Sequence, residues 1–390
     1  MNLNIDMSEV TRLTRMGRLD EAMTVLRAGV LPASPETTKD VVAEVIEMVQ
    51  TDGTGSAWCA ASGGAETVPP AAKPRTAKVK LDGLAELVGL HTAFAARGTV
   101  ADSQARPLAP GATFDNRVFA NAAGSRTYRL YVPGSYTGQP VPLMVMLHGC
   151  TQSPEDFAAG TRMNALAEAH GFLVAYPAQS QAANMNRCWN WFNSADQQRE
   201  GGEPSLLAGI TREVMADYAV DARRVFVAGL SAGGAMAAIL GHAYPDLYAG
   251  IGVHSGLPVG AAHDMASAFA AMTQGNPSAA VGGKRATVPM IIFHGDADRT
   301  VHVSNGDQLT TQAHRSGGLK RHAPFQDSHG GRQHTTTRYS DGQGRIVLEH
   351  WLLHGAGHAW SGGDSSGSFT DGKGPVASAE MVRFFLKLRA

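Results

Sequence analysis

The feature that most constrains the fold is a G-x-S-x-G motif that joins a predicted strand to a predicted helix. An apolar run over 225–228 precedes Gly229, Ser231 and Gly233, and a predicted helix over 232–242 that begins with small residues follows. In that setting the motif predicts a nucleophile elbow, a tight turn whose glycines let the strand and the helix cross closely. The turn holds the serine in a strained conformation, and the first helical amides favour negative charge beside its hydroxyl. The alternative interpretation is a glycine-rich turn with an idle serine.

Predicted strands and helices alternate from about residue 113 to the end of the chain. Strands are predicted at 126–132 (an edge strand), 143–147, 172–176, 224–228, 249–254, 290–293 and 345–353 (the last strand), and helices at 157–170, 206–218, 232–242, 263–273 and 377–388. The alternation predicts the α/β class, with an open, mostly parallel sheet covered by helices on both faces. In such sheets ligands bind at the carboxyl ends of the strands.

The chain before residue 113 has a different composition. Helical periodicity at 7–16, 19–28 and 37–50 predicts a small helical segment over 1–50. Residues 51–112 are rich in small residues and proline up to about residue 80, and contain a short apolar patch, which predicts a linker. No catalytic candidate lies in either segment. We therefore expect a catalytic domain over 113–390 and expect residues 1–110 to be dispensable for its chemistry.

Charge and hydropathy exclude several classes of partner. The formal net charge of −1 over 390 residues gives no basis for nucleic acid or an anionic membrane surface as partner. No apolar run approaches the roughly 18 residues that span a bilayer. The N-terminus lacks the apolar core of a secretory signal, so no signal peptide is predicted. Three cysteines are too few for a disulfide scaffold.

A serine nucleophile needs a base, and the base needs an acid that orients it. In this class of sheet the partners follow the serine in the order acid, then histidine, each just after a strand. Asp296 and Asp298 follow the predicted strand at 290–293, and His358 stands in a glycine-containing loop after the last predicted strand, preceded by Gly355 and Gly357. His354 and His358 have the spacing of helical metal ligands, but the glycines between them disfavour a helix. No metal or other cofactor is predicted.

The same logic predicts the groups that stabilise an oxyanion. One donor is the backbone amide of Ala232, directly after the nucleophile, and the second is that of Cys150 in the loop after an earlier buried strand. Cys188 follows the next strand along the chain, so both cysteines belong to the same edge of the sheet. That placement is compatible with a disulfide and also with two buried thiols.

Three tryptophans stand in these loops. Trp189 and Trp191 follow Cys188, and Trp360 follows His358. Their position predicts a surface that contacts an acyl group or a polymer, and the alternative is ordinary core packing.

Five ordered motifs together resemble the polyhydroxybutyrate depolymerase family of esterases, over about residues 113–390. They are His148–Gln152, Cys188–Phe192, Gly229–Gly233, His294–Asp298 and Gly357–Gly363. The resemblance implies an α/β-hydrolase fold and hydrolysis of carboxylic esters through an acyl-enzyme.

The resemblance also implies site residues. It makes Ser231 the nucleophile, Asp298 the acid and His358 the base, and it implies a disulfide between Cys150 and Cys188. The choice of Asp298 over Asp296 agrees with position, because Asp298 lies two residues farther along, where the loop can turn back across the sheet edge.

The predicted function is a serine esterase that hydrolyses polyhydroxyalkanoate-type polyesters or their oligomers, with a polyester or a small ester as partner. A feruloyl or acetylxylan esterase is the alternative, because those families share much of the pattern. An alternative of another class is a protein that binds polyester granules, with hydrolysis secondary. The resemblance and the implied disulfide favour an extracellular or periplasmic location, whereas the N-terminus predicts no export signal. The sequence makes no prediction about oligomeric state.

Overall fold

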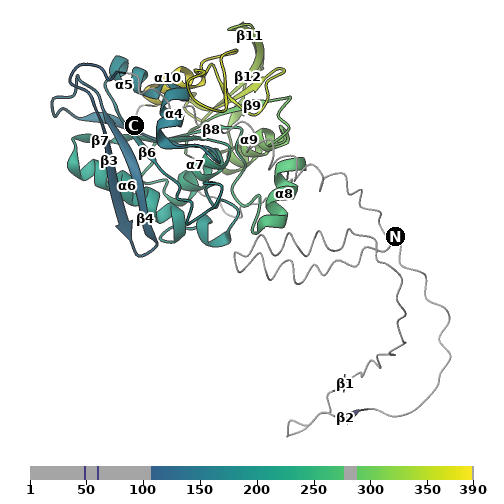
Figure 1. The fold of residues 1–390 in the computed structure, drawn as a ribbon. Helices are drawn as coiled ribbons and strands as arrows, with labels where there is room; N and C mark the ends of the chain where they lie inside the picture. Colours follow the sequence, from purple (N-terminus) through teal and green to yellow (C-terminus); the bar gives the residue numbers. More distant parts are fainter. Residues whose placement is uncertain (1–47, 50–58, 61–106, 276–287, 389–390) are drawn as a thin grey trace, which may run out of the picture. The chain divides into compact units, whose positions relative to one another are not determined.

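The computed structural model describes residues 48–49, 59–60, 107–275 and 288–388 (Figure 1). Most of the predicted helical segment and linker lies outside these residues. Within them, β1 (Met48–Val49) pairs antiparallel with β2 (Cys59–Ala60). The prediction of a helix over 37–50 is therefore wrong at residues 48–49. Pairing with residues 59–60 makes these two residues a strand despite the helical periodicity of the sequence.

An 11-stranded sheet organises the rest of the described chain. Its order is β10 (Lys320–Arg321), β12 (Arg332–Ser340), β13 (Ile346–Leu353), β9 (Met290–Gly295), β8 (Gly250–His254), β7 (Val220–Leu230), β5 (Val141–Leu147), β6 (Leu173–Pro177), β4 (Gly124–Val132) and β3 (Thr113–Asn121), and β11 (Phe325–His329) pairs with β12. Neighbouring strands from β13 to β6 are parallel, and β12, β4 and β3 are antiparallel to their neighbours. The predicted α/β fold with a mostly parallel sheet is confirmed.

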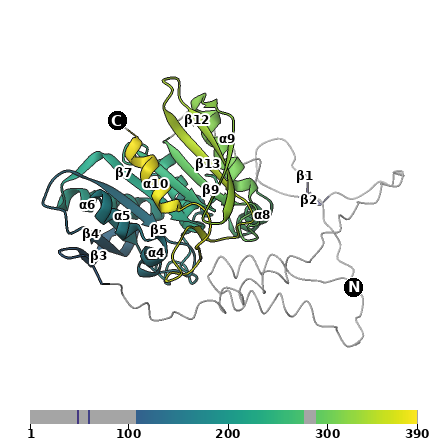
Figure 2. The ribbon, with the colours of Figure 1, turned by 90° about the horizontal axis from the view of Figure 1, so that it is seen from above.

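Helices cover both faces of this sheet (Figures 1 and 2). Side chains of α4 (Pro154–Thr161), α5 (Met163–His170) and α10 (Ala377–Lys387) join one apolar cluster, and those of α6 (Gly202–Asp217), α7 (Ala232–Ala243), α8 (Met265–Gln274) and α9 (Ser304–Gly317) join the other. None of these described helices combines the length and the apolar content that crossing a membrane requires.

Strand β5 shows why its sequence is a continuous apolar run. Leu143, Val145 and Leu147 point into one apolar cluster, and Met144 and Met146 point into the other. Because successive side chains of a strand alternate between faces, a strand covered on both sides must be apolar at every position.

Several predicted elements differ from those observed. The helix predicted over 157–170 is two helices, because Arg162 between them adopts a left-handed conformation with φ of 55°. The strand predicted as an edge strand, β4, lies inside the sheet because β3 pairs along its outer side. The last predicted strand is followed by a short parallel pair, β14 (Trp360–Ser361) and β15 (Thr370–Asp371).

Candidate active site

The turn between β7 and α7 has the geometry of a nucleophile elbow. Ser231 has φ of 58° and ψ of −120°, a strained conformation for a residue with a Cβ. A Cβ on Gly229 would lie 2.4 Å from the backbone of Gly233, and one on Gly233 would lie 2.1 Å from the carbonyl oxygen of Leu147. Only glycines allow this close crossing, which is why they flank the serine.

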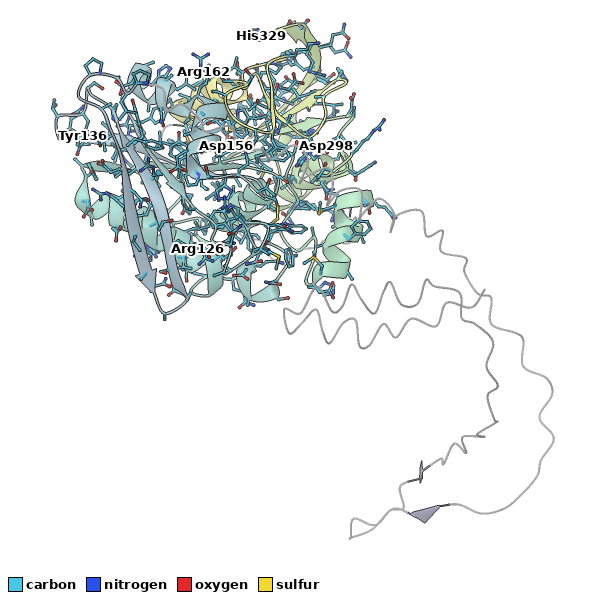
Figure 3. All side chains as sticks on the ribbon, in the orientation of Figure 1. Arg126, Tyr136, Asp156, Arg162, Asp298 and His329 are labelled. Carbon is cyan, nitrogen blue, oxygen red and sulfur yellow. A yellow bond between two sulfur atoms is a disulfide. The ribbon has the colours of Figure 1, made fainter. Side chains whose placement is uncertain are left out.

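The predicted acid and base are in contact. Nδ1 of His358 lies 2.7 Å from Oδ2 of Asp298, and both side chains are almost completely buried. The other carboxylate oxygen of Asp298 accepts backbone N–H bonds from Thr300 and Val301, each 2.9 Å long. These bonds hold the carboxylate so that it faces the imidazole ring; Figure 3 marks Asp298 among the surrounding side chains.

The strand order explains how these residues come to one edge of the sheet. Ser231 follows β7, His254 ends β8, Asp298 follows β9 and His358 follows β13, and these four parallel strands are consecutive neighbours. Their carboxyl ends therefore lie side by side. A hydrogen bond from Ser231 to His358 stays a prediction. Within the described residues Nε2 of His358 has no recorded partner, which leaves it free to act as a base.

The second acidic residue has a histidine of its own. Oδ2 of Asp296 lies 2.9 Å from Nδ1 of His354, and Oδ1 accepts the backbone N–H of Gly355. Nε2 of His354 is bonded to the hydroxyl of Thr335 at 2.8 Å. Because both ring nitrogens of His354 are engaged, this pair has no free nitrogen with which to take a proton from a nucleophile.

The two carboxylates differ in their electrostatics. Burial by itself raises the pKa of Asp298, but the neighbouring His358 and its hydrogen bond lower the pKa to about 2. Partial burial by itself raises the pKa of Asp296, but its bonds to His354 and to the N–H of Gly355, together with the nearby charges of His354 and Arg332, lower it. Asp298 is therefore ionised at any pH near neutrality and can stabilise a positive charge on His358.

Hydrogen bonds donated by its backbone N–H groups hold the loop after β5 in place. The N–H of Gly149 donates to Oε1 of Gln152 at 2.9 Å, and the N–H of Thr151 donates to the carbonyl of Asn186 at 2.7 Å. Among the described residues none accepts a bond from the N–H of Cys150, between these two. The N–H of Ala232 lies at the start of α7, where helical amides have no partner within the helix. Both predicted oxyanion donors are thus available, and their role stays a prediction.

A disulfide joins the loops after β5 and β6. The sulfurs of Cys150 and Cys188 are bonded at 2.05 Å, and their Cα atoms are 4.2 Å apart. The two residues are therefore not the separate buried thiols of the alternative interpretation. The link anchors the residue predicted to donate to the oxyanion.

We expect thiol counting under denaturing, non-reducing conditions to find one free thiol per chain, that of Cys59. In the chain-entropy model, closing a loop with a sequence separation of 38 residues stabilises the fold by about 4 kcal/mol. Reduction should therefore lower the melting temperature. Three free thiols in the unreduced protein would contradict the pairing.

One buried histidine in this site carries no motif and was missed from the sequence. The backbone carbonyl of His254 accepts the N–H of Ser231 at 2.9 Å, and Nε2 of its ring accepts the N–H of Ser361 at 3.0 Å. The ring stacks between Phe293 and Trp360 and is completely buried, which lowers its pKa to about 3. A neutral His254 therefore links the elbow to the loop that carries the base. In the sequence, the sole indication of this role for His254 is that an isolated histidine ends an apolar strand.

We expect replacement of His254 by leucine to lower both stability and kcat. The buried N–H of Ser361 would lose its acceptor, which costs about 1–3 kcal/mol of unfolding free energy. The loop that positions His358 would lose an anchor, so kcat should fall more than KM rises. Replacement by glutamine, whose amide oxygen can accept the same bond, should recover part of the loss. Urea unfolding and steady-state kinetics of both variants test this, and an unchanged kcat in the leucine variant would contradict it.

The three tryptophans predicted to contact substrate lie in the core. Trp189 is completely buried and donates to the carbonyl of His148 at 3.1 Å. Trp360 is 1% exposed, and Trp191 is 5% exposed. The predicted contact surface is therefore corrected: these rings pack behind the site loops, because large aromatic side chains stabilise loops best when they are buried.

Comparisons with known proteins agree with this architecture. The chain is 34% identical over 235 residues to poly(3-hydroxyalkanoate) depolymerase C of Paucimonas lemoignei, an alignment that covers 57% of this chain and 56% of that protein. It is 30% identical over 203 residues to a probable acetylxylan esterase A of Aspergillus fumigatus, covering 48% and 53% of the two chains. The chain thus spans about half the length of these curated relatives. The solved acetyl xylan esterase from Aspergillus awamori shares the fold, with a TM-score of 0.55 and 21% identity over 70% of this chain and 98% of that one.

The family assignment rests on a match to a family model. The model of the family described as esterase PHB depolymerase matches residues 126–341, more than half of the chain. That range includes the disulfide, the elbow and the predicted acid. The chain belongs to the PHB depolymerase family of esterases.

Proposed function

We propose that this chain is a serine carboxylesterase whose catalytic domain spans residues 113–390. The observation that carries the proposal is the buried pair of Asp298 and His358, at the same sheet edge as the strained Ser231. A buried carboxylate bonded to one nitrogen of an imidazole, with the other nitrogen free, suits general base catalysis.

The first half of the reaction acylates the serine. Nε2 of His358 takes the hydroxyl proton while Oγ of Ser231 attacks the ester carbonyl carbon, and the carbonyl electrons move to the oxygen. The N–H groups of Cys150 and Ala232 stabilise the resulting oxyanion, and Asp298 stabilises the imidazolium. When the intermediate collapses, the bond to the alcohol oxygen breaks and His358 returns its proton to that oxygen.

Water completes the cycle. It gives a proton to His358 as its oxygen attacks the acyl carbon, and a second oxyanion forms between the same two amides. Collapse breaks the bond to Oγ, and the proton returns to the serine. The products are a carboxylic acid and an alcohol.

We propose polyhydroxyalkanoate-type polyesters or their oligomers as substrates. Support comes from the depolymerase of Paucimonas lemoignei, which has the highest identity among the relatives named above. Esters of plant cell walls are the second candidate, because an acetylxylan esterase aligns with nearly half of this chain.

A substrate panel tests the proposal. We expect hydrolysis of p-nitrophenyl butyrate and of an amorphous polyhydroxybutyrate film, and little hydrolysis of methyl ferulate or acetylated xylan. The Ser231→Ala variant supplies the background for every substrate. A preference for acetylated xylan or methyl ferulate would replace the polyester proposal, and a protein that hydrolyses no ester would overturn the esterase itself.

A further inference from the structure

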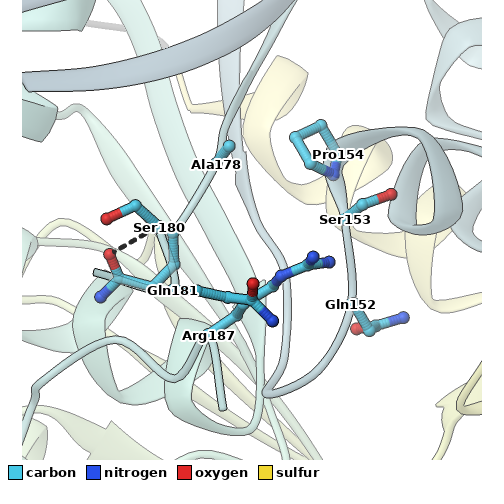
Figure 4. A pocket seen from close by; sticks show the side chains of 8 residues that line it. Gln152, Ser153, Pro154, Ala178, Ser180, Gln181 and Arg187 are labelled. Atoms are coloured by element: carbon cyan, nitrogen blue, oxygen red, sulfur yellow. Dashed lines mark hydrogen bonds between the residues drawn. The ribbon is translucent and has the colours of Figure 1, made fainter. Parts of the chain in front are cut away.

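A polar pocket of about 230 Å³ lies beside the loop that carries the predicted oxyanion donor. It is lined by residues 152–154, which lead into α4, by residues 178–181, which follow β6, and by Arg187. Figure 4 shows the side chain of Arg187 reaching between these two segments. The catalytic steps described above do not use the pocket.

The position of Arg187 is fixed from both sides. The preceding residue, Asn186, accepts the N–H of Thr151, and the following residue, Cys188, is bonded to Cys150. Since consecutive Cα atoms are about 3.8 Å apart, the Cα of Arg187 lies no more than about 8 Å from that of Cys150. The pocket and the predicted oxyanion donor therefore belong to the same two disulfide-linked loops.

The guanidinium of Arg187 has no ion-pair partner among the described residues. The two acids in the first turn of α4, the helix that begins at the pocket, are already engaged. Glu155 pairs with Arg129 at 2.9 Å. Asp156 accepts bonds from Gln152 and from the backbone and hydroxyl of Ser368. A half-buried cation with no internal partner is available to an anionic ligand.

Of the other lining residues, Gln181 carries an amide that can donate or accept, and two serines carry hydroxyls. The hydroxyl oxygens of Ser153 and Ser180 each accept a backbone N–H, from Asp156 and from Ala183, so their own O–H groups remain to donate. The side chains of Gln152 and Gln179 are occupied by internal bonds. A positive charge together with the amide donor of Gln181 matches a carboxylate, which accepts several hydrogen bonds and donates none.

We propose that this pocket binds the free carboxylate of a short hydroxyacid oligomer, on the leaving-alcohol side of the ester that is cleaved. In a linear 3-hydroxyacid oligomer the one free carboxylate belongs to the terminal unit, whose hydroxyl is esterified. The pocket then favours cleavage near that end of short oligomers. This inference rests on the proposed esterase function and adds a preference for one end of the substrate.

The test compares the 3-hydroxybutyrate trimer as the free acid with the same trimer as its methyl ester. Arg187→Gln should lower kcat/KM for the free acid by about tenfold to a hundredfold, mainly through KM, because the contact is equal in ground and transition states. It should leave the methyl ester and p-nitrophenyl butyrate within about twofold. The wild-type preference for the free acid should also weaken as salt is added.

Arg162→Gln is the matched control. Arg162 has the same left-handed backbone, with φ of 55° against 52° for Arg187, but it follows the last turn of α4, whereas the pocket adjoins the first (Figure 3). This variant should leave all three substrates unchanged.

Equal loss on both trimers in Arg187→Gln, or a wild type that does not distinguish them, would overturn the proposal. Hydrolysis of p-nitrophenyl butyrate and of the methyl ester by the wild type tests the esterase activity separately. The experiment therefore distinguishes a wrong pocket proposal from a wrong esterase proposal.

Discussion

Replacing Ser231 by alanine should abolish ester hydrolysis, lowering kcat by a factor on the order of 10⁴ to 10⁶. The substitution removes Oγ, the atom proposed to attack the substrate ester. Folding should be nearly unaffected, because alanine keeps the Cβ that the turn already accommodates at φ of 58°. The free energy of unfolding should change by less than about 1 kcal/mol, since no described residue is recorded as bonded to the serine hydroxyl. Hydrolysis of p-nitrophenyl butyrate and urea unfolding measure the two quantities.

For a buried hydroxyl outside the site we expect the opposite pattern, a loss of stability without a loss of activity. Thr211 of α6 is fully buried, and its hydroxyl is bonded to the carbonyl of Leu207 and to the hydroxyl of Tyr248. Thr211→Val should lower stability by about 1–3 kcal/mol while kcat stays near the wild-type value. If Ser231→Ala retains most of its activity while folded, the elbow does not carry the nucleophile.

The parallel centre of the fold was predictable because its strands are covered on both sides. β5 and β7 are continuous apolar runs near their carboxyl ends, which distinguishes them from loops. Of the antiparallel strands, β4 was predicted, whereas β3, β10, β11 and β12 were not. β12 has the sequence RQHTTTRYS, and only tertiary pairing with β13 makes this polar segment a strand. α9 escaped prediction because few of its residues, such as Leu309 and Ala313, enter the core.

The site was predictable to the extent that its residues follow strands in a set order. Gly229 and Gly233 flank Ser231, Gly355 and Gly357 precede His358, and the predicted acid lies in a short loop that holds only two candidates. The role of His254 was not predictable, because it depends on a bond to Ser361, more than a hundred residues away. The burial of Trp360 likewise depends on its edge-to-face contact with Phe157 and its stacking against His254.

Replacing Asp298 by asparagine should lower kcat by a factor on the order of 10⁴ while the protein stays folded. The amide oxygen can still accept the bonds from Thr300 and Val301, but its NH₂ group would face Nδ1 of His358. Nδ1 must then accept rather than donate, so the proton moves to Nε2 and the ring can no longer act as a base. Steady-state kinetics with p-nitrophenyl butyrate measure the loss.

We also expect Asp298→Asn to differ from the wild type in how its free energy of unfolding depends on pH. Because the pKa of Asp298 in the folded chain is about 2, below the ordinary 3.8, its ionisation stabilises the fold above about pH 4. That contribution is lost as the pH falls from about 4 through 2. Asparagine does not titrate, so the stability difference in favour of the wild type should narrow over this range. Urea unfolding of both proteins at several pH values tests the direction.

Asp296→Asn is the matched control, since Asp296 lies two residues away and contacts a histidine in the same way. Its side chain is 37% exposed, and His354 already has Thr335 on its other nitrogen. The substitution should therefore cost about 1 kcal/mol of stability and leave kcat almost unchanged. If Asp296→Asn instead loses activity while folded and Asp298→Asn does not, the base is His354. The hydrogen bond of Thr335 to that ring would then have to break in each catalytic cycle.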